Sequence, residues 1–165
     1  MVKHESNFNK PTSTSSAQAL WESDKREFTF WALSLVGAKP RKKGDEIEGI
    51  LGFVESGNKK RTILVHATGK RLIPGIIQDL LKAMDNEGAA IGLLISLHKP
   101  TLGMITDSVH AGSYESELWK KKFLKIQIRT MQELLDGKSF DIPQTYSLVK
   151  KAPLAKKRGE TAQLL

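Results

Sequence analysis

The sequence predicts an α/β protein, with a mixed β-sheet of about four strands and helices on both faces of the sheet. Apolar spacing switches repeatedly between the 3.6-residue period of helices and the alternation of strands. Residues 89–97 form a continuous apolar run between polar breaks, which is typical of a central strand buried on both faces. A hairpin, then a helix, then this buried strand predict a right-handed crossover into a mixed sheet.

The first half of the chain predicts a helix and a hairpin. The apolar residues of 17–36 fall close to one helical stripe, and Asp24 with Glu27 has the spacing of a capping box. Residues 46–54 and 60–67 are two strand-like runs around a Ser-Gly-Asn turn. We therefore expect an opening helix that leads into an antiparallel strand pair.

The second half predicts helices and strands in alternation. Proline suits the first position of a helix, so a helix is expected to begin near Pro74. It is followed by the buried strand at 89–97, a short helix at 101–111 and a half-exposed strand at 124–128. Thr130 and Glu133 have capping-box spacing and open a last helix.

Composition predicts one domain, at residues 17–151, between two flexible ends. Residues 1–16 are polar and residues 152–165 are rich in lysine, so we expect a flexible arm and a basic flexible tail. No stretch approaches the roughly 18 apolar residues that a membrane-spanning helix needs, and we expect no signal peptide. The chain has no cysteine, which excludes disulfides and thiolate chemistry and favours a cytoplasmic protein.

A formal net charge of +8 indicates a polyanionic partner, and nucleic acid is the commonest one. The positive charge is concentrated in short runs, most of them in or beside expected turns. We expect the DNA-contacting side chains to be Lys42, Lys43, Lys70, Arg71, Lys120, Lys121 and Lys122. The sequence has neither a GxxxxGK[ST] phosphate loop nor a His-Glu-x-x-His pair, so it gives no support for ATP use or zinc proteolysis.

The predicted hairpin has the layout of a metal-dependent nuclease site. Such a site uses carboxylates to hold Mg²⁺ beside the scissile phosphate, and a lysine to position the attacking water. A carboxylate on the first strand and two groups spaced two residues apart on the second strand share a face, because side chains alternate along a strand. Glu48 lies on the first predicted strand, and His66 and Thr68 have this spacing on the second.

Five segments resemble the restriction-endonuclease-like domains (PD-(D/E)XK, Mrr-type) that are found beside or fused to site-specific DNA methyltransferases. They are spread over most of the chain, at residues 21–40, 47–49, 76–80, 89–101 and 126–138. The resemblance implies a restriction-endonuclease-like fold, double-stranded DNA as a partner, and Mg²⁺ or Mn²⁺ as the cofactor of an active enzyme. It also implies a DNA methyltransferase as a partner protein, and it is compatible with a homodimer.

The resemblance also assigns roles to single residues. The family's Ile-Asp-Gly motif carries a metal-binding aspartate, and Glu48 occupies its place; Glu27 matches the acidic residue of the opening helix. Where the family has Gln-Val-Lys, this chain has the tripeptide from His66 to Thr68, which implies Glu48 and His66 as metal ligands. Thr68 carries no charge, and Lys70 follows about 7 Å further along an extended strand.

Two hypotheses follow from these departures. The first is a DNA-binding domain with a degenerate, weak or inactive nuclease site, acting in restriction–modification or DNA repair. The alternative is an active Mg²⁺- or Mn²⁺-dependent endonuclease that uses Glu48, His66 and Lys70, with Glu27 in support. A protein-interaction scaffold with no nucleic-acid role is a third hypothesis, which an absent or salt-insensitive DNA interaction would favour. Both nuclease-derived hypotheses predict Glu48 and His66 on one face of adjacent strands.

Overall fold

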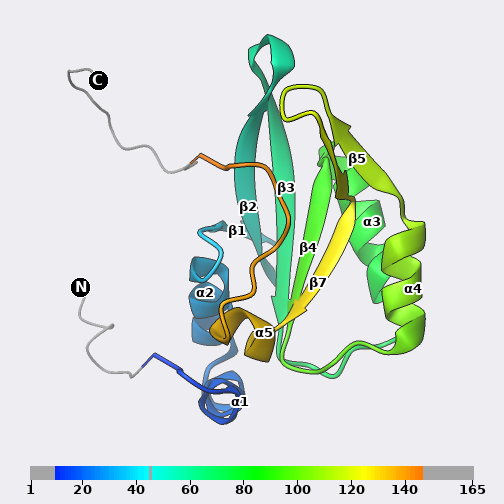
Figure 1. The fold of residues 1–165 in the computed structure, drawn as a ribbon. Helices are drawn as coiled ribbons and strands as arrows, with labels where there is room; N and C mark the ends of the chain where they lie inside the picture. Colours follow the sequence, from blue (N-terminus) through cyan, green and yellow to red (C-terminus); the bar gives the residue numbers. More distant parts are fainter. Residues whose placement is uncertain (1–9, 45, 147–165) are drawn as a thin grey trace, which may run out of the picture.

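The computed structural model describes residues 10–44 and 46–146, and Figure 1 shows their arrangement. Two helices come first and three strands follow, after which one helix precedes a single strand, the next precedes three strands and a last helix ends the order. In chain order the elements are α1 (Thr14–Ser23), α2 (Lys25–Ser34), β1 (Lys39–Lys43), β2 (Glu46–Glu55), β3 (Lys59–Thr68), α3 (Ile76–Glu87), β4 (Ile91–Ser96), α4 (Leu102–His110), β5 (Ser113–Ser116), β6 (Lys121–Leu124), β7 (Ile126–Thr130) and α5 (Met131–Leu135).

A five-stranded mixed sheet with the order β1-β2-β3-β4-β7 forms the centre of the fold. Strands β1, β2 and β3 are antiparallel neighbours, whereas β4 is parallel to both β3 and β7. A short 3-10 turn, Ser56–Asn58, joins β2 to β3, and α3 connects β3 to β4. The predicted α/β class, the hairpin and the helical connection into a parallel strand are confirmed, and the sheet has one strand more than expected.

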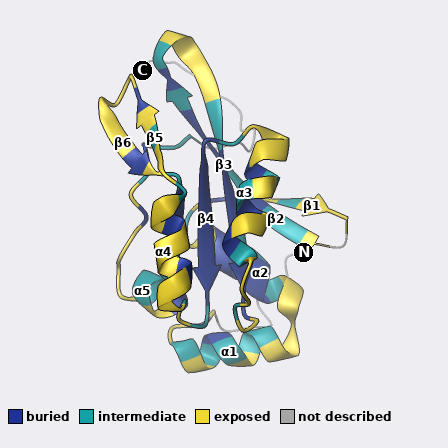
Figure 2. Ribbon diagram, turned by 90° about the vertical axis from the view of Figure 1, so that its right-hand side faces the viewer, coloured by how far each residue is buried: buried dark blue, intermediate teal, exposed yellow. Residues whose placement is uncertain are grey.

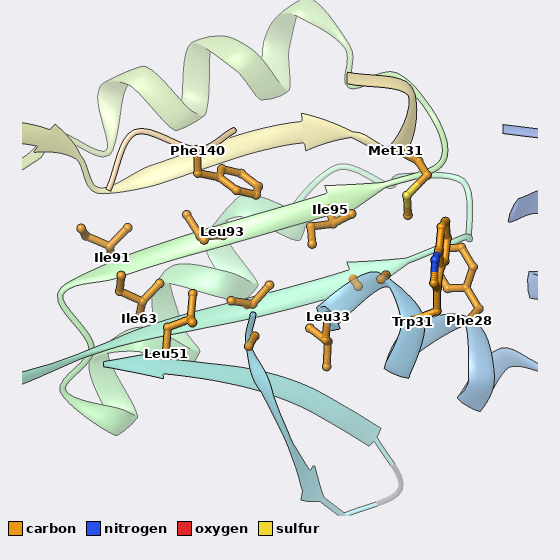
Figure 3. Close-up of a cluster of buried hydrophobic side chains, with 14 of the residues drawn as sticks. Phe28, Trp31, Leu33, Leu51, Ile63, Ile91, Leu93, Ile95, Met131 and Phe140 are labelled. Atoms are coloured by element: carbon orange, nitrogen blue, oxygen red, sulfur yellow. The ribbon is translucent and has the colours of Figure 1, made fainter. Parts of the chain in front are cut away.

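Apolar side chains pack on both faces of this sheet. On the face that we call the first, Phe28 and Trp31 belong to the same core cluster as Leu93 of β4 (Figure 3). On the second face, Leu94 of β4 packs in a cluster with Ile77 of α3. Because neighbouring residues of β4 face opposite cores, the whole strand is buried, as Figure 2 shows and as its apolar run predicts.

The N-terminal helical region differs from the single helix expected at 17–36. It forms two helices, because Asp24 leaves the helical conformation and its side chain accepts a hydrogen bond from the backbone N–H of Glu27, at 3.1 Å. Helix α1 starts at Thr14 behind a Ser13 cap, so it includes the end of the arm expected at 1–16. Residues 1–9 and the expected tail at 152–165 lie outside the described residues.

Three further regions of the chain differ from the sequence prediction. The basic run Lys39–Lys43, expected near a turn, forms strand β1 at the edge of the sheet, where proline and lysine are tolerated. Helix α3 begins after Gly75 rather than at Pro74. Strands β5 and β6 form a separate hairpin that the sequence did not predict. None of the helices in the described part of the chain is long and apolar enough to cross a membrane.

A buried carboxylate fastens the β5–β6 hairpin to the end of the β2–β3 hairpin. Glu55, at the end of β2, accepts hydrogen bonds from the N–H groups of Ser56 at 3.0 Å and Leu118 at 2.8 Å. The hydroxyls of Ser116, at 3.0 Å, and of Tyr114 also donate to it. Burial alone would raise the pKa of Glu55, but these four hydrogen bonds together lower it to about 2.

Candidate functional site

A groove of about 780 Å³ opens on the second face, beside the carboxyl end of β3. Residues of β2, β3 and α3 line most of it, and the segment between β3 and α3 forms one wall. Trp21 of α1 and the start of α2 line its end. Leu64 and Leu94 from the strands and Leu80 from α3 form an apolar floor, around which the charged side chains are placed.

Glu48 and His66 lie next to each other in this groove. Strands β2 and β3 pair with Gly49 opposite Val65, so continuing this register by one residue places Glu48 opposite His66. Directly opposite residues of an antiparallel pair share a face, and both side chains line the groove. The prediction of one face and adjacent strands is confirmed.

The neighbouring edge strand supplies a partner for Glu48 that the sequence did not reveal. Arg41 of β1 pairs directly opposite Glu48, and its Nε lies 3.1 Å from Glu48 Oε2 while its Nη2 forms an ion pair with the same oxygen. Arg41 Nη2 also lies 3.1 Å from Oε2 of Glu87, at the end of α3. Lys43 Nζ reaches Glu87 at 3.2 Å, and this hydrogen bond is the main cause that lowers the pKa of Glu87.

His66 is neutral at neutral pH in this setting. Its pKa is lowered chiefly because burial disfavours the charged imidazolium, and the nearby cation Lys70 lowers it further. The carboxylates of Glu46 and Glu48 act in the opposite direction but do not outweigh burial. A neutral imidazole can accept a proton or a hydrogen bond at one nitrogen and donate at the other.

The end of β3 positions Thr68 and Lys70. Thr68 is buried, and its Oγ1 accepts a hydrogen bond from the backbone N–H of Lys70 at 3.0 Å, so the chain turns immediately after the strand. Between them, Gly69 packs on Trp21 so closely that an added Cβ would lie 2.4 Å from the indole. Lys70 is exposed but still lines the groove, where it lies near enough to His66 to affect its pKa.

The groove is lined by more cations than carboxylates. The cationic side chains are Lys25, Arg26, Lys43, Lys70 and Arg71, and the carboxylates are Glu46, Glu48 and Asp79. The sequence prediction missed Lys25, Arg26, Glu46 and Asp79. Glu46 could have been found, since it lies two residues before Glu48 on the same strand face. The others enter the groove only through the packing of α2 and α3 around the end of the sheet.

Other predicted site residues lie away from the groove. Lys42 is opposite Ile47 in the β1–β2 ladder, so its side chain is on the other face from Arg41 and Lys43. Glu27 lies in the first turn of α2 and is not among the residues that line the groove. The lysines at 120–122 are in the β5–β6 hairpin, which contacts the β2–β3 turn before β3. Thr68 lies at the other end of β3, whose ten residues span roughly 30 Å.

The groove does not fit the divalent cation that the family resemblance implies. Within residues 10–44 and 46–146, no three His, Cys, Asp or Glu side chains are grouped so that they could hold a metal ion. Glu48 is the best-placed hard ligand, but Arg41 already neutralises its charge. His66 is a softer ligand than Mg²⁺ prefers, and Thr68 offers only an uncharged hydroxyl that is hydrogen-bonded to Lys70.

Fold and site together define an α/β protein with a basic groove at the end of the central strands. Comparison of the chain with protein-family models, with curated proteins and with solved structures gave no match. The residues of the groove and the family resemblance of the sequence are therefore the features that bear on function.

Proposed function

We propose that this chain is a restriction-endonuclease-like DNA-binding domain that holds double-stranded DNA in the groove and does not cleave it. The observation that carries the proposal is the composition of the groove, in which five cations surround a hairpin of nuclease layout whose carboxylate is already paired with Arg41. Cations on a groove rim bind phosphates without reading sequence, so sequence preference should be weak. The proposed setting is a cytoplasmic restriction–modification or repair system with a DNA methyltransferase as partner.

Two features of the groove oppose catalysis. A lysine that positions the attacking water and stabilises the developing charge would belong at Thr68, which is uncharged and buried. The Arg41–Glu48 ion pair must also open before Glu48 could hold a metal, and Glu87 keeps Arg41 in place from the other side.

A second candidate function is the active endonuclease, and one observation favours it. Glu48, His66 and Lys70 line one groove, and Lys70 lies close enough to His66 to lower the pKa of its imidazole. In this version Lys70 takes the role of the missing lysine, and Mg²⁺ or Mn²⁺ binds beside Glu48 and His66. The two candidates differ in whether the wild-type protein cuts DNA.

The proposed DNA contact is tested by comparing two double variants. Lys70→Ala/Arg71→Ala removes two groove cations, whereas Lys120→Ala/Lys122→Ala removes two cations from the distant hairpin. Each lost phosphate contact reduces the slope of log K against log salt concentration by about 0.9. Near 0.1 M salt this corresponds to a roughly tenfold loss of affinity. We expect duplex binding, measured by fluorescence anisotropy, to weaken on the order of 100-fold in the groove variant.

The hairpin variant is the matched control, because it carries the same loss of charge. It is expected to bind the duplex within a factor of about two of wild type. Equal weakening in both variants would mean that net charge, and not the groove, holds the duplex. Wild-type binding by the groove variant would exclude the groove as the duplex site.

A further inference from the structure

Two turns that are distant in sequence form one exposed tip at the end of the sheet opposite the groove (Figure 1). One is the β2–β3 turn at Ser56–Asn58, and the other is the turn between β5 and β6. Ser56 Oγ donates to Glu117 Oε1 across the two turns, at 2.7 Å. We call this surface the paired tip.

The paired tip presents an aromatic ring beside lysines. Trp119 is 41% exposed and Leu118 is 49% exposed. Within residues 10–44 and 46–146, Trp119 has neither a ring partner nor a cation over its indole. The exposed cations in the two turns and at the strand ends beside them include Lys59, Lys60, Lys120 and Lys122, none of which has an ion-pair partner among the described residues. They outnumber the two exposed carboxylates of the tip, Glu115 and Glu117.

Hydrogen bonds to Glu55 and Ser116 fix the backbone beneath this exposed surface. The N–H of Leu118 donates to the buried Glu55 carboxylate, and the N–H of Trp119 donates to Ser116 Oγ at 3.0 Å. Ser116 in turn donates to Glu55, so the backbone under both exposed side chains is fixed to the end of β2. Because the backbone that carries the ring is already fixed, less conformational freedom is lost when a ligand stacks on Trp119.

We propose that the paired tip is a second nucleic-acid-binding surface, which takes unpaired nucleotides: a base stacks on Trp119, and the lysines around it contact the flanking phosphates. Bases expose their faces for stacking only where the strand is unpaired, so the surface selects single strands over duplex. This proposal extends the proposed DNA-binding function to a surface remote from the groove. Binding at the paired tip does not require that the groove binds duplex DNA. Lys120 and Lys122 thereby keep their predicted DNA contact, at a different site.

An anionic membrane surface fits the tip less well. Interfacial anchoring needs a continuous apolar face together with the charges, and this tip has two partly exposed apolar side chains with two carboxylates among its lysines. Stacking of a base requires only one aromatic ring with cations at its edge. The charge pattern therefore favours the nucleic acid.

The test measures binding of a fluorescein-labelled oligothymidylate by anisotropy, together with quenching of tryptophan fluorescence. Loss of a base–aromatic stack weakens binding on the order of tenfold, so Trp119→Ala should show a loss of this size. Trp119→Phe keeps an aromatic face and should bind within a few-fold of wild type, but the oligonucleotide should no longer quench its tryptophan fluorescence. Lys120→Ala/Lys122→Ala should reduce the salt slope by about 0.7 for each lost contact.

Control variants keep this result separate from the groove. Lys70→Ala/Arg71→Ala should leave oligothymidylate binding unchanged even though it weakens duplex binding, and an unaltered thermal midpoint shows that Trp119→Ala is folded. Wild-type affinity of Trp119→Ala for the oligonucleotide overturns the proposal. So does Trp119-dependent binding to phosphatidylserine vesicles in place of oligothymidylate. A groove that fails to bind duplex, with tip binding retained, overturns only the proposed function.

Discussion

At Glu48 the carboxylate faces a guanidinium on one side and an imidazole on the other. The pairing with Arg41 comes from the β1–β2 ladder and the pairing with His66 from the β2–β3 ladder. The predicted hairpin, together with the period of two along its strands, was enough to predict that Glu48 and His66 share a face. Arg41 could not be predicted, because Lys39–Lys43 gives no signal for a strand and forms one only by pairing with the edge of β2.

Restoring a lysine at position 68 tests the assigned loss of catalysis. We expect wild-type protein to leave plasmid DNA uncut with Mg²⁺. Thr68→Lys/Glu48→Asp/His66→Gln combined with Arg41→Ala should nick it, because the lysine supplies a charge stabiliser worth about 100- to 1000-fold in rate and the carboxylate loses its ion-pair partner. Conversion of supercoiled plasmid to open circles is the measurement. Mg²⁺-dependent cleavage by wild type, abolished separately by Glu48→Ala and by Lys70→Ala, would contradict the account and favour the active endonuclease.

The lowered pKa of His66 predicts a dependence of stability on pH. Below the ordinary histidine pKa of about 6.5, the unfolded chain binds a proton that the folded chain resists, so stability is complete above this pH and declines as pH falls. Urea unfolding between pH 5 and 7.5 should show this decline, with a slope of at most about 1.4 kcal/mol for each pH unit. His66→Gln removes the titrating group and should flatten the curve, whereas parallel curves for the two proteins would contradict the pKa assignment.

Helices and strands with strong local sequence signals could be predicted, whereas elements that depend on long-range pairing could not. Capping residues and apolar period predicted α3, α4, α5 and the strands β2, β3, β4 and β7. The β5–β6 hairpin escaped prediction because its inward side chains alternate over only four residues in each strand. Glu55, which holds it, is a polar residue beside a turn in sequence and becomes buried only when the two hairpins meet.

Replacing Glu55 tests this role. Glu55→Gln keeps the volume but removes the charge that four donors share, and breaking a buried charged network of this kind costs about 3 kcal/mol. Chemical unfolding at pH 7 measures the loss. Glu115→Gln, an exposed change in the same hairpin, is the control and should alter stability by less than about 0.5 kcal/mol. Equal effects of the two substitutions would mean that the network contributes nothing.

The lowered pKa of Glu55 predicts that the folded protein loses stability in acid. A folded-state pKa of about 2 for Glu55 gives stability that is present above its ordinary pKa of about 4.5 and is lost as pH falls towards 2. The difference between wild type and Glu55→Gln should therefore shrink in this window, which lies below the one in which His66 titrates. A difference that is constant from pH 6 to pH 2.5 would contradict the assigned pKa.

At the scale of the whole molecule, the fold divides the positive charge between two ends of the sheet. Composition predicted a polyanionic partner, but it could not show that Lys70 and the lysines at 120–122 lie at opposite ends of β3. The order of residues in the sequence did not reveal this separation, because four separate segments line the groove and two distant turns form the tip. The groove and the tip are thus separate surfaces, and a single duplex in the groove accounts only for the first.

The salt dependence of duplex binding tests the central claim most directly. Five cations line the groove, and neutralising five phosphates predicts that log K falls against log salt concentration with a slope near −4 to −5. The measurement is anisotropy of a labelled duplex without metal ions over a range of salt concentrations. We expect this steep slope, with little difference between duplex sequences. A flat response, or no binding at low salt, would contradict a DNA-binding role for the groove.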